Sequence, residues 1–230
     1  MKTRHAGVFT PGWWGKYGPR PGHLPARAHP WHPWRHWNRW NHRPHYWWRW
    51  ASAATLTRWF VGRPWGAAIY YDYGVGGNFY YDNDMVYIDG QEVCSAEEYA
   101  EQAYQIAEAL PEVPEEQEVE WMPLGVFALT NQDKGEPDMM LQLAVSKEGI
   151  IAGSYFNTTT ETTLPIEGSV DRETQRAAWT VVNDKGDSPV MECGIYNLTQ
   201  DETTVLVHFG KDTTQQWLLV RMPEQEDSQE

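Results

Sequence analysis

Apolar and polar residues alternate along most of the last hundred residues of the chain. Met139, Leu141, Leu143 and Val145 alternate with small or polar neighbours, which is the period of a strand buried on one face. Such a pattern predicts a mainly β domain over 121–223 made of eight short strands with hairpin-sized connections. An antiparallel up-and-down meander of this kind closes naturally into a barrel, because closure leaves no exposed edge. Besides 139–146, the predicted strands are 124–129, 149–157, 162–170, 175–182, 190–198, 203–209 and 215–222.

A different pattern precedes this domain. Residues 46–60 are rich in Trp and Ala and contain no helix breaker, which predicts a Trp-rich amphipathic helix within 46–66. Residues 1–45 are rich in Pro and Gly and poor in aliphatic side chains, so we expect this basic arm to be partly disordered.

The region 67–110 carries the signals of a β-hairpin followed by a helix. Aromatic and β-branched residues are broken by turn-forming Asp, Asn and Gly at 82–84 and 89–90. Ser95 followed by Glu98 has the spacing of a capping box, and it predicts a helix from there to residue 110. The predicted organisation is completed by an acidic Pro/Glu linker at 111–120 and an acidic tail at 224–230.

Charge divides the chain into two parts. No Asp or Glu precedes Asp72, whereas eleven of the 18 Lys and Arg do, so the first part carries about +11 and the remainder, with seven Lys and Arg against 32 Asp and Glu, about −25. Eleven of the fourteen Trp and seven of the eight His also precede Asp72. A basic and aromatic segment suits an anionic surface, where rings lie at headgroup depth and guanidinium groups attract the anions.

We therefore expect the first part of the chain to attach the protein to an anionic surface, either lipid or glycan, or to another protein. In the alternative interpretation the predicted helix packs onto the β domain or onto a second copy. Nucleic acid is disfavoured as a partner because the acidic body would repel a polyanion. The candidate attachment residues are Trp34, Arg35, Trp37, Arg39, Trp40, Trp47, Arg49, Trp50, Arg58 and Trp59.

Catalytic chemistry has one candidate. If residues 200–201 form a two-residue turn, Cys193 lies opposite His208 on one sheet face, where the imidazole could stabilise a thiolate. A shift of one residue in the strand register would instead place the two side chains on opposite faces. The sequence contains no phosphate-binding loop, serine elbow or zinc signature. We expect a protein that is not an enzyme and has no catalytic residues, no metal and no cofactor. Glu192 is expected to face solvent, and Cys94 and Cys193 allow at most one disulfide.

Sequence runs between residues 70 and 221 resemble two groups of known proteins. The runs YYDYG (70–74), VYIDGQEV (86–93), EGIIAGSYFNTTTETT (148–163) and QQWLLVR (215–221) resemble secreted or surface-associated planctomycete proteins of unassigned function, often called protocadherin-like. This resemblance implies an extracellular or cell-envelope location, although no signal peptide and no apolar run of membrane-spanning length is visible in the sequence.

The runs at 150–157, 176–182 and 216–220 are also similar to strands of avidin and streptavidin. The resemblance implies a calycin- or avidin-like barrel in which Tyr155, Trp179 and Trp217 line a small-molecule pocket. Two positions depart from that pattern: Leu129 stands where a ligand-binding Asn is expected, and Glu192 stands where a strand Trp is expected. A small-ligand-binding barrel is thus the alternative to the surface-attachment hypothesis.

Overall fold

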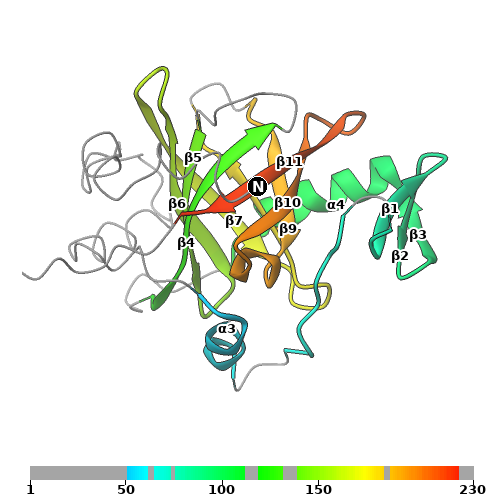
Figure 1. The fold of residues 1–230 in the computed structure, drawn as a ribbon, viewed down its shortest axis with the longest axis horizontal. Helices are drawn as coiled ribbons and strands as arrows, with labels where there is room; N and C mark the ends of the chain where they lie inside the picture. The colour runs from blue at the N-terminus through cyan, green and yellow to red at the C-terminus, as the bar shows by residue number, and fades with distance from the viewer. Residues whose placement is uncertain are drawn as a thin grey trace, which may run out of the picture.

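The computed structural model describes residues 51–61, 65–73, 76–111, 119–131, 139–183 and 187–222. Its centre is a closed antiparallel barrel in which each strand pairs with its neighbours in sequence and the first pairs with the last (Figure 1). The barrel confirms the predicted fold class. Its strands are β4 (Trp121–Asn131), β5 (Met139–Ser146), β6 (Ile150–Asn157), β7 (Thr162–Val170), β8 (Arg176–Val181), β9 (Val190–Gly194), β10 (Glu202–His208) and β11 (Thr214–Arg221).

The barrel interior is filled with hydrophobic side chains. Inward-facing residues of all eight strands form one continuous buried cluster that includes Phe127, Leu143, Ile166 and Trp179. An eight-stranded barrel is narrow enough for side chains to fill it in this way. The inner face of the barrel is therefore the hydrophobic core of the protein.

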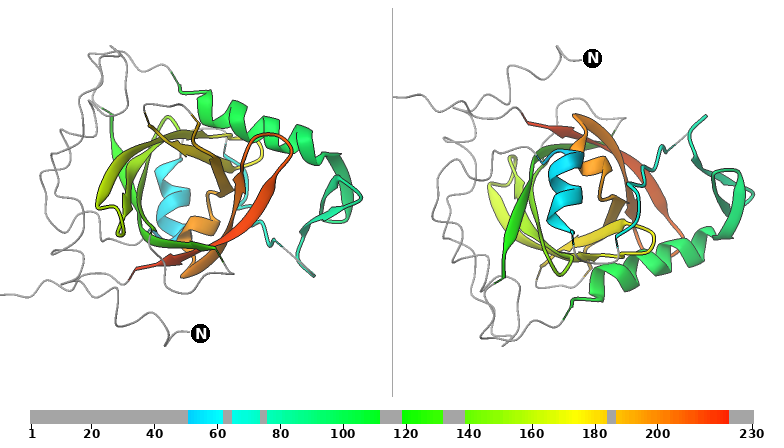
Figure 2. Two further views of the ribbon diagram at one scale, coloured as in Figure 1. Left: turned by 90° about the horizontal axis from the view of Figure 1, so that it is seen from above. Right: turned by 90° about the horizontal axis from the view of Figure 1, so that it is seen from below.

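Helix α3 (Ala53–Trp59) closes one end of the barrel, and both views along the barrel show it within the barrel outline (Figure 2). Ser52 caps this helix through a reciprocal pair of hydrogen bonds with Thr55. Leu56 and Phe60 lie four residues apart on one helix face, and both are buried in the barrel core. The helix is shorter than the sequence predicted, and residues 46–50 lie outside the described residues.

A second layer covers part of the outer wall. Helix α4 (Ala96–Glu108) begins at the predicted capping box of Ser95 and Glu98 and packs across β7, β8 and β9. Small residues allow the close approach, because Ala103 and Ala107 of the helix contact Ala178 and Val190 of the wall.

A three-stranded sheet lies at one end of α4 (Figure 1). Its strands are β1 (Phe79–Asp82), β2 (Met85–Ile88) and β3 (Gln91–Ser95). Both predicted turns are confirmed by positive φ angles at Asn83, Asp84 and Asp89 and at Gly90. Phe79 and Val86 of this sheet pack with Tyr99 of α4 and Leu206 of β10, which joins the sheet to the barrel.

Candidate functional site

The three residues predicted to line a pocket all lie on the inner face of the barrel. Trp179 is fully buried within the core cluster, whereas Tyr155 and Trp217 are half-buried at its edge. Trp217 pairs with Asn131, the last residue of β4, and Tyr155 lies near the last residue of β6. The structure thus places Tyr155 and Trp217 at the end of the barrel opposite α3, with Trp179 deeper.

Two hydrogen bonds among the described residues at this end involve the predicted pocket residues. The Trp217 Nε1–H donates to Gln215 Oε1 over 2.9 Å, and the Asn157 amide donates to the Tyr155 hydroxyl over 3.3 Å. The buried Nε1–H of Trp179 has no hydrogen-bond partner. Leu129, which stands where the avidin pattern has a ligand-binding Asn, is part of the buried core.

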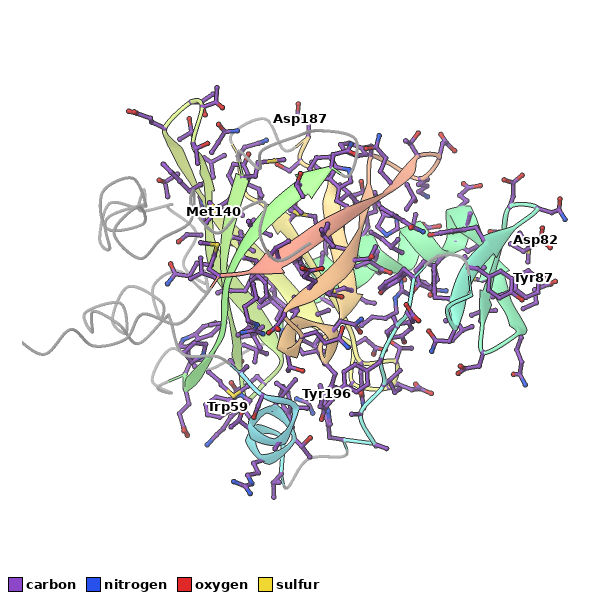
Figure 3. All side chains as sticks on the ribbon, in the orientation of Figure 1. Trp59, Asp82, Tyr87, Met140, Asp187 and Tyr196 are labelled. Atoms are coloured by element: carbon purple, nitrogen blue, oxygen red, sulfur yellow. The ribbon has the colours of Figure 1, made fainter. Side chains whose placement is uncertain are left out.

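The closed end contains two of the candidate attachment residues. Arg58 is exposed on α3, and Trp59 is half-buried against the core with the Lys147 ammonium 5.2 Å from its ring centre. Figure 3 shows Trp59 and Tyr196 near α3, and the Tyr196 hydroxyl shares a 2.9 Å hydrogen bond with Thr57 of the helix. The other eight candidates lie outside the described residues: Trp34, Arg35, Trp37, Arg39, Trp40, Trp47, Arg49 and Trp50.

The predicted juxtaposition of Cys193 and His208 is wrong. A 3₁₀ turn, η2 (Asn197–Thr199), lengthens the connection between β9 and β10, and the resulting register pairs His208 with Val190. Cys193 therefore lies inside the barrel and His208 on its outer wall. Burial, together with the Glu192 charge, raises the pKa of the Cys193 thiol, which disfavours a thiolate. Cys94 and Cys193 are both free.

The prediction for Glu192 is also wrong, because α4 and the small sheet cover the outer wall at that position. The Glu192 side chain is fully buried and pairs with Arg176, whose Nη2 lies 2.5 Å from Glu192 Oε2. We call the buried group formed by Arg176, Glu192, His208 and Tyr99 the Glu192 cluster. No sequence motif marks it, since the residues come from three strands and a helix.

Arg176 is the most highly connected member of the Glu192 cluster. Its guanidinium donates to Glu192 Oε2, to Gln102 Oε1 over 2.7 Å and to the Tyr99 carbonyl over 3.0 Å, and it stacks 3.6 Å from the centre of the Tyr99 ring. Burial lowers the pKa of Arg176, but the charge and hydrogen bond of Glu192, together with Tyr99 and Tyr73, outweigh this effect and leave the pKa above its usual value. Arg176 therefore stays charged and ties α4 to the barrel wall.

His208 occupies the other side of Glu192. Its Nδ1 shares a 2.8 Å hydrogen bond with the Thr214 hydroxyl, and its Nε2 lies 3.9 Å from Glu192 Oε2, beyond hydrogen-bond distance. Burial lowers the pKa of His208 below 6.5, an effect that Glu192 opposes and Arg176 reinforces. The imidazole is therefore neutral at pH 7.

The residues that the structure describes contain neither a metal-binding cluster nor a membrane-spanning helix. No group of three or more His, Cys, Asp or Glu side chains there could hold a metal ion. None of the helices in that part of the chain is long and apolar enough to cross a membrane.

Comparisons with protein-family models, with curated proteins and with solved structures found no match to this chain. Its function must therefore be argued from its own residues and geometry.

Proposed function

We propose that the protein is a non-enzymatic attachment module, in which the barrel is the folded body and residues 1–50 bind an anionic surface outside the cell or in the cell envelope. The observation that carries this proposal is the continuous hydrophobic cluster inside the barrel, which includes Leu56 of α3 and Phe60 directly after the helix. A filled barrel offers its outer surface and its flanking segments for binding. The chain joins this body at Ala51, which is itself buried in the core.

The composition of residues 1–50 supports an anionic partner. This segment contains nine of the 18 Lys and Arg and nine of the fourteen Trp, and no Asp or Glu. Each basic residue near an anionic membrane contributes roughly 1 kcal/mol, and the contribution falls with added salt. Acidic glycans present the same kind of charge, so lipid and glycan are two sources of one ligand chemistry.

The structure determines where a deletion should be made to test this proposal. Removing residues 1–66 would also remove α3 and open the barrel, whereas a variant of residues 51–230 keeps Ser52, Leu56 and Phe60. We expect the full chain to cosediment with vesicles containing phosphatidylserine, and the 51–230 variant to remain in solution with an unchanged melting temperature. The full chain should bind vesicles of phosphatidylcholine alone much more weakly.

Immobilised heparin in place of vesicles distinguishes a glycan from a lipid surface, because retention on heparin without vesicle binding indicates a glycan. A charge variant with Arg35, Arg39, Arg43 and Arg49 changed to Gln should lose most of the binding. Its control is Lys211→Gln, which removes an exposed positive charge from the barrel, outside the candidate attachment residues. Equal binding by the full chain and the 51–230 variant would refute the proposal.

A second candidate function is supported by the aromatic residues at the end of the barrel opposite α3. Tyr155 and Trp217 are half-buried there, and the buried Nε1–H of Trp179 has no hydrogen-bond partner among the described residues, a combination suited to a planar molecule with a hydrogen-bond acceptor. Native mass spectrometry of the purified full chain should then show a retained small molecule that is lost in Trp217→Ala. An unmodified mass for the full chain would remove this candidate.

A further inference from the structure

The Glu192 cluster contains an enclosed polar site that is independent of the proposed attachment function. It lies between the outer wall of β8, β9 and β10 on one side and α4 with the small sheet on the other. The rings of Tyr73 and Tyr99 both pack against Phe79, with centroids 4.9 and 5.1 Å from the Phe79 centroid. The Tyr81 ring also packs against Phe79, with a centroid distance of 5.3 Å, and all three tyrosines lie close enough to Glu192 for its charge to act on their hydroxyls.

Five polar atoms in this site are buried and have no hydrogen-bond partner among the described residues. They are Glu192 Oε1, His208 Nε2 and the hydroxyls of Tyr73, Tyr81 and Tyr99. Glu192 and His208 are fully buried residues, and Tyr99 is buried almost completely. Most buried polar groups in folded proteins are hydrogen-bonded, so five unpartnered atoms around one buried ion pair indicate that something is bound beside it.

The donor and acceptor balance of these atoms limits what that guest can be. Burial, together with the Glu192 charge, raises the pKa of Tyr73, Tyr81 and Tyr99, so all three phenols stay protonated and can donate. Glu192 Oε1 is an acceptor, and the Nε2 of neutral His208 accepts when Nδ1–H donates to Thr214 and donates in the other tautomer. The site therefore needs a guest that can both accept and donate hydrogen bonds.

The charge balance limits the guest further. The Glu192 carboxylate is already neutralised by Arg176 at a separation of 2.5 Å, and His208 adds no charge at pH 7. An ion of either sign would leave net charge in a site without access to solvent, which is costly. A neutral guest avoids that cost.

We propose that the site encloses water, as a short hydrogen-bonded chain, which accepts from Tyr73, Tyr81 and Tyr99 and donates to Glu192 Oε1. Water both donates and accepts, so the chain can also pair with His208 Nε2 in either tautomer. This water completes the hydrogen bonds of the Glu192 cluster, which holds α4 and the small sheet against the barrel.

Substitution of Tyr99 or Tyr73 by phenylalanine tests the proposal through the sign of the change in stability. If the Tyr99 hydroxyl binds water, Tyr99→Phe breaks a hydrogen bond and should raise the unfolding equilibrium constant by roughly fivefold, and Tyr73→Phe should act in the same direction. In a dry site each hydroxyl is an unsatisfied buried group, and its removal should leave the protein equally or more stable.

Two tyrosines outside the site are matched controls. The Tyr104 hydroxyl donates to the His208 carbonyl over 3.0 Å and accepts from the Gly210 N–H over 2.9 Å, so Tyr104→Phe gives the size of a known loss. Tyr70 is exposed, and Tyr70→Phe should change little.

A crystal structure of the full chain at high resolution provides a direct test that does not depend on any variant. We expect a water oxygen roughly 2.6–3.2 Å from Glu192 Oε1. Absence of density there, combined with stabilisation by Tyr99→Phe, would overturn the proposal. A metal ion, an anion or an organic molecule in that position would also overturn it.

Discussion

Replacing Glu192 by Ala tests whether the outer wall of the barrel is buried as the structure indicates. The Arg176 side chain is only 3% exposed, and Glu192 is the single anion with which it pairs among the described residues. Without Glu192, the guanidinium keeps the oxygens of Gln102 and Tyr99 but stays buried without a compensating charge. Breaking a buried pair in this way costs about 3–5 kcal/mol, which is a large part of the ~5–15 kcal/mol that stabilises a typical protein.

Urea unfolding followed by tryptophan fluorescence measures this cost. The matched control is Glu120→Ala, because Glu120 pairs with Lys147 at 2.8 Å on the surface, where an ion pair contributes about 0.2–1 kcal/mol. A double variant with Arg176→Met and Glu192→Leu should lose less stability than Glu192→Ala alone, because it leaves no buried charge. A loss below about 1 kcal/mol for Glu192→Ala, or additive effects of the Arg176 and Glu192 substitutions, would refute the assignment of a buried pair.

Three other outcomes are expected. Leu56→Ala should cost about 2–5 kcal/mol in urea unfolding because Leu56 fills the α3 end of the barrel, whereas the exposed Thr55→Ala should lose only the contribution of a helix cap. Burial lowers the pKa of His208 below 6.5, so the contribution of neutral His208 to stability is complete above pH 6.5 and is lost as the pH falls through the folded pKa. Between pH 7 and 5 the full chain should therefore lose stability more steeply than the His208→Gln variant. Parallel stability profiles for the two proteins would contradict this. Gly168→Ala should destabilise by at least about 1–3 kcal/mol, because a Cβ there would lie 2.0 Å from the Ala178 carbonyl oxygen, while Gly66→Ala, with its nearest contact at 3.7 Å, should be almost neutral.

The barrel could be predicted from the sequence because apolar residues recur at every second position of strands such as β5. The run from Met139 to Val145 has this period, and its apolar residues pack in or against the barrel core, although the structure buries both faces of the strand. Helix α4 could also be predicted from the sequence, because the hydrogen bonds of its capping box join two residues close in the chain, Ser95 and Glu98. Both predictions depend on residues close together in the chain.

Helix α3 shows where local pattern stops being informative. An apolar pair four residues apart, such as Leu56 and Phe60, looks the same in a helix that lies on a membrane and in one that plugs a barrel. The distinction depends on which surface meets that face, and this is a tertiary property. The structure assigns the face to the barrel interior, so the attachment hypothesis now rests on residues 1–50.

The Glu192 cluster was missed for a related reason. An acidic residue in the middle of a strand normally faces solvent, and Glu192 would do so if α4 did not cross β8 and β9. The crossing depends on Ala103 and Ala107 meeting Ala178, a small-residue contact that the sequence does not signal. The same covering layer that hides Glu192 makes its ion pair with Arg176 necessary, because a lone carboxylate could not remain charged there. The buried ion pair of Glu192 and Arg176 is thus a consequence of packing α4 and the small sheet over a barrel wall that carries the Glu192 charge.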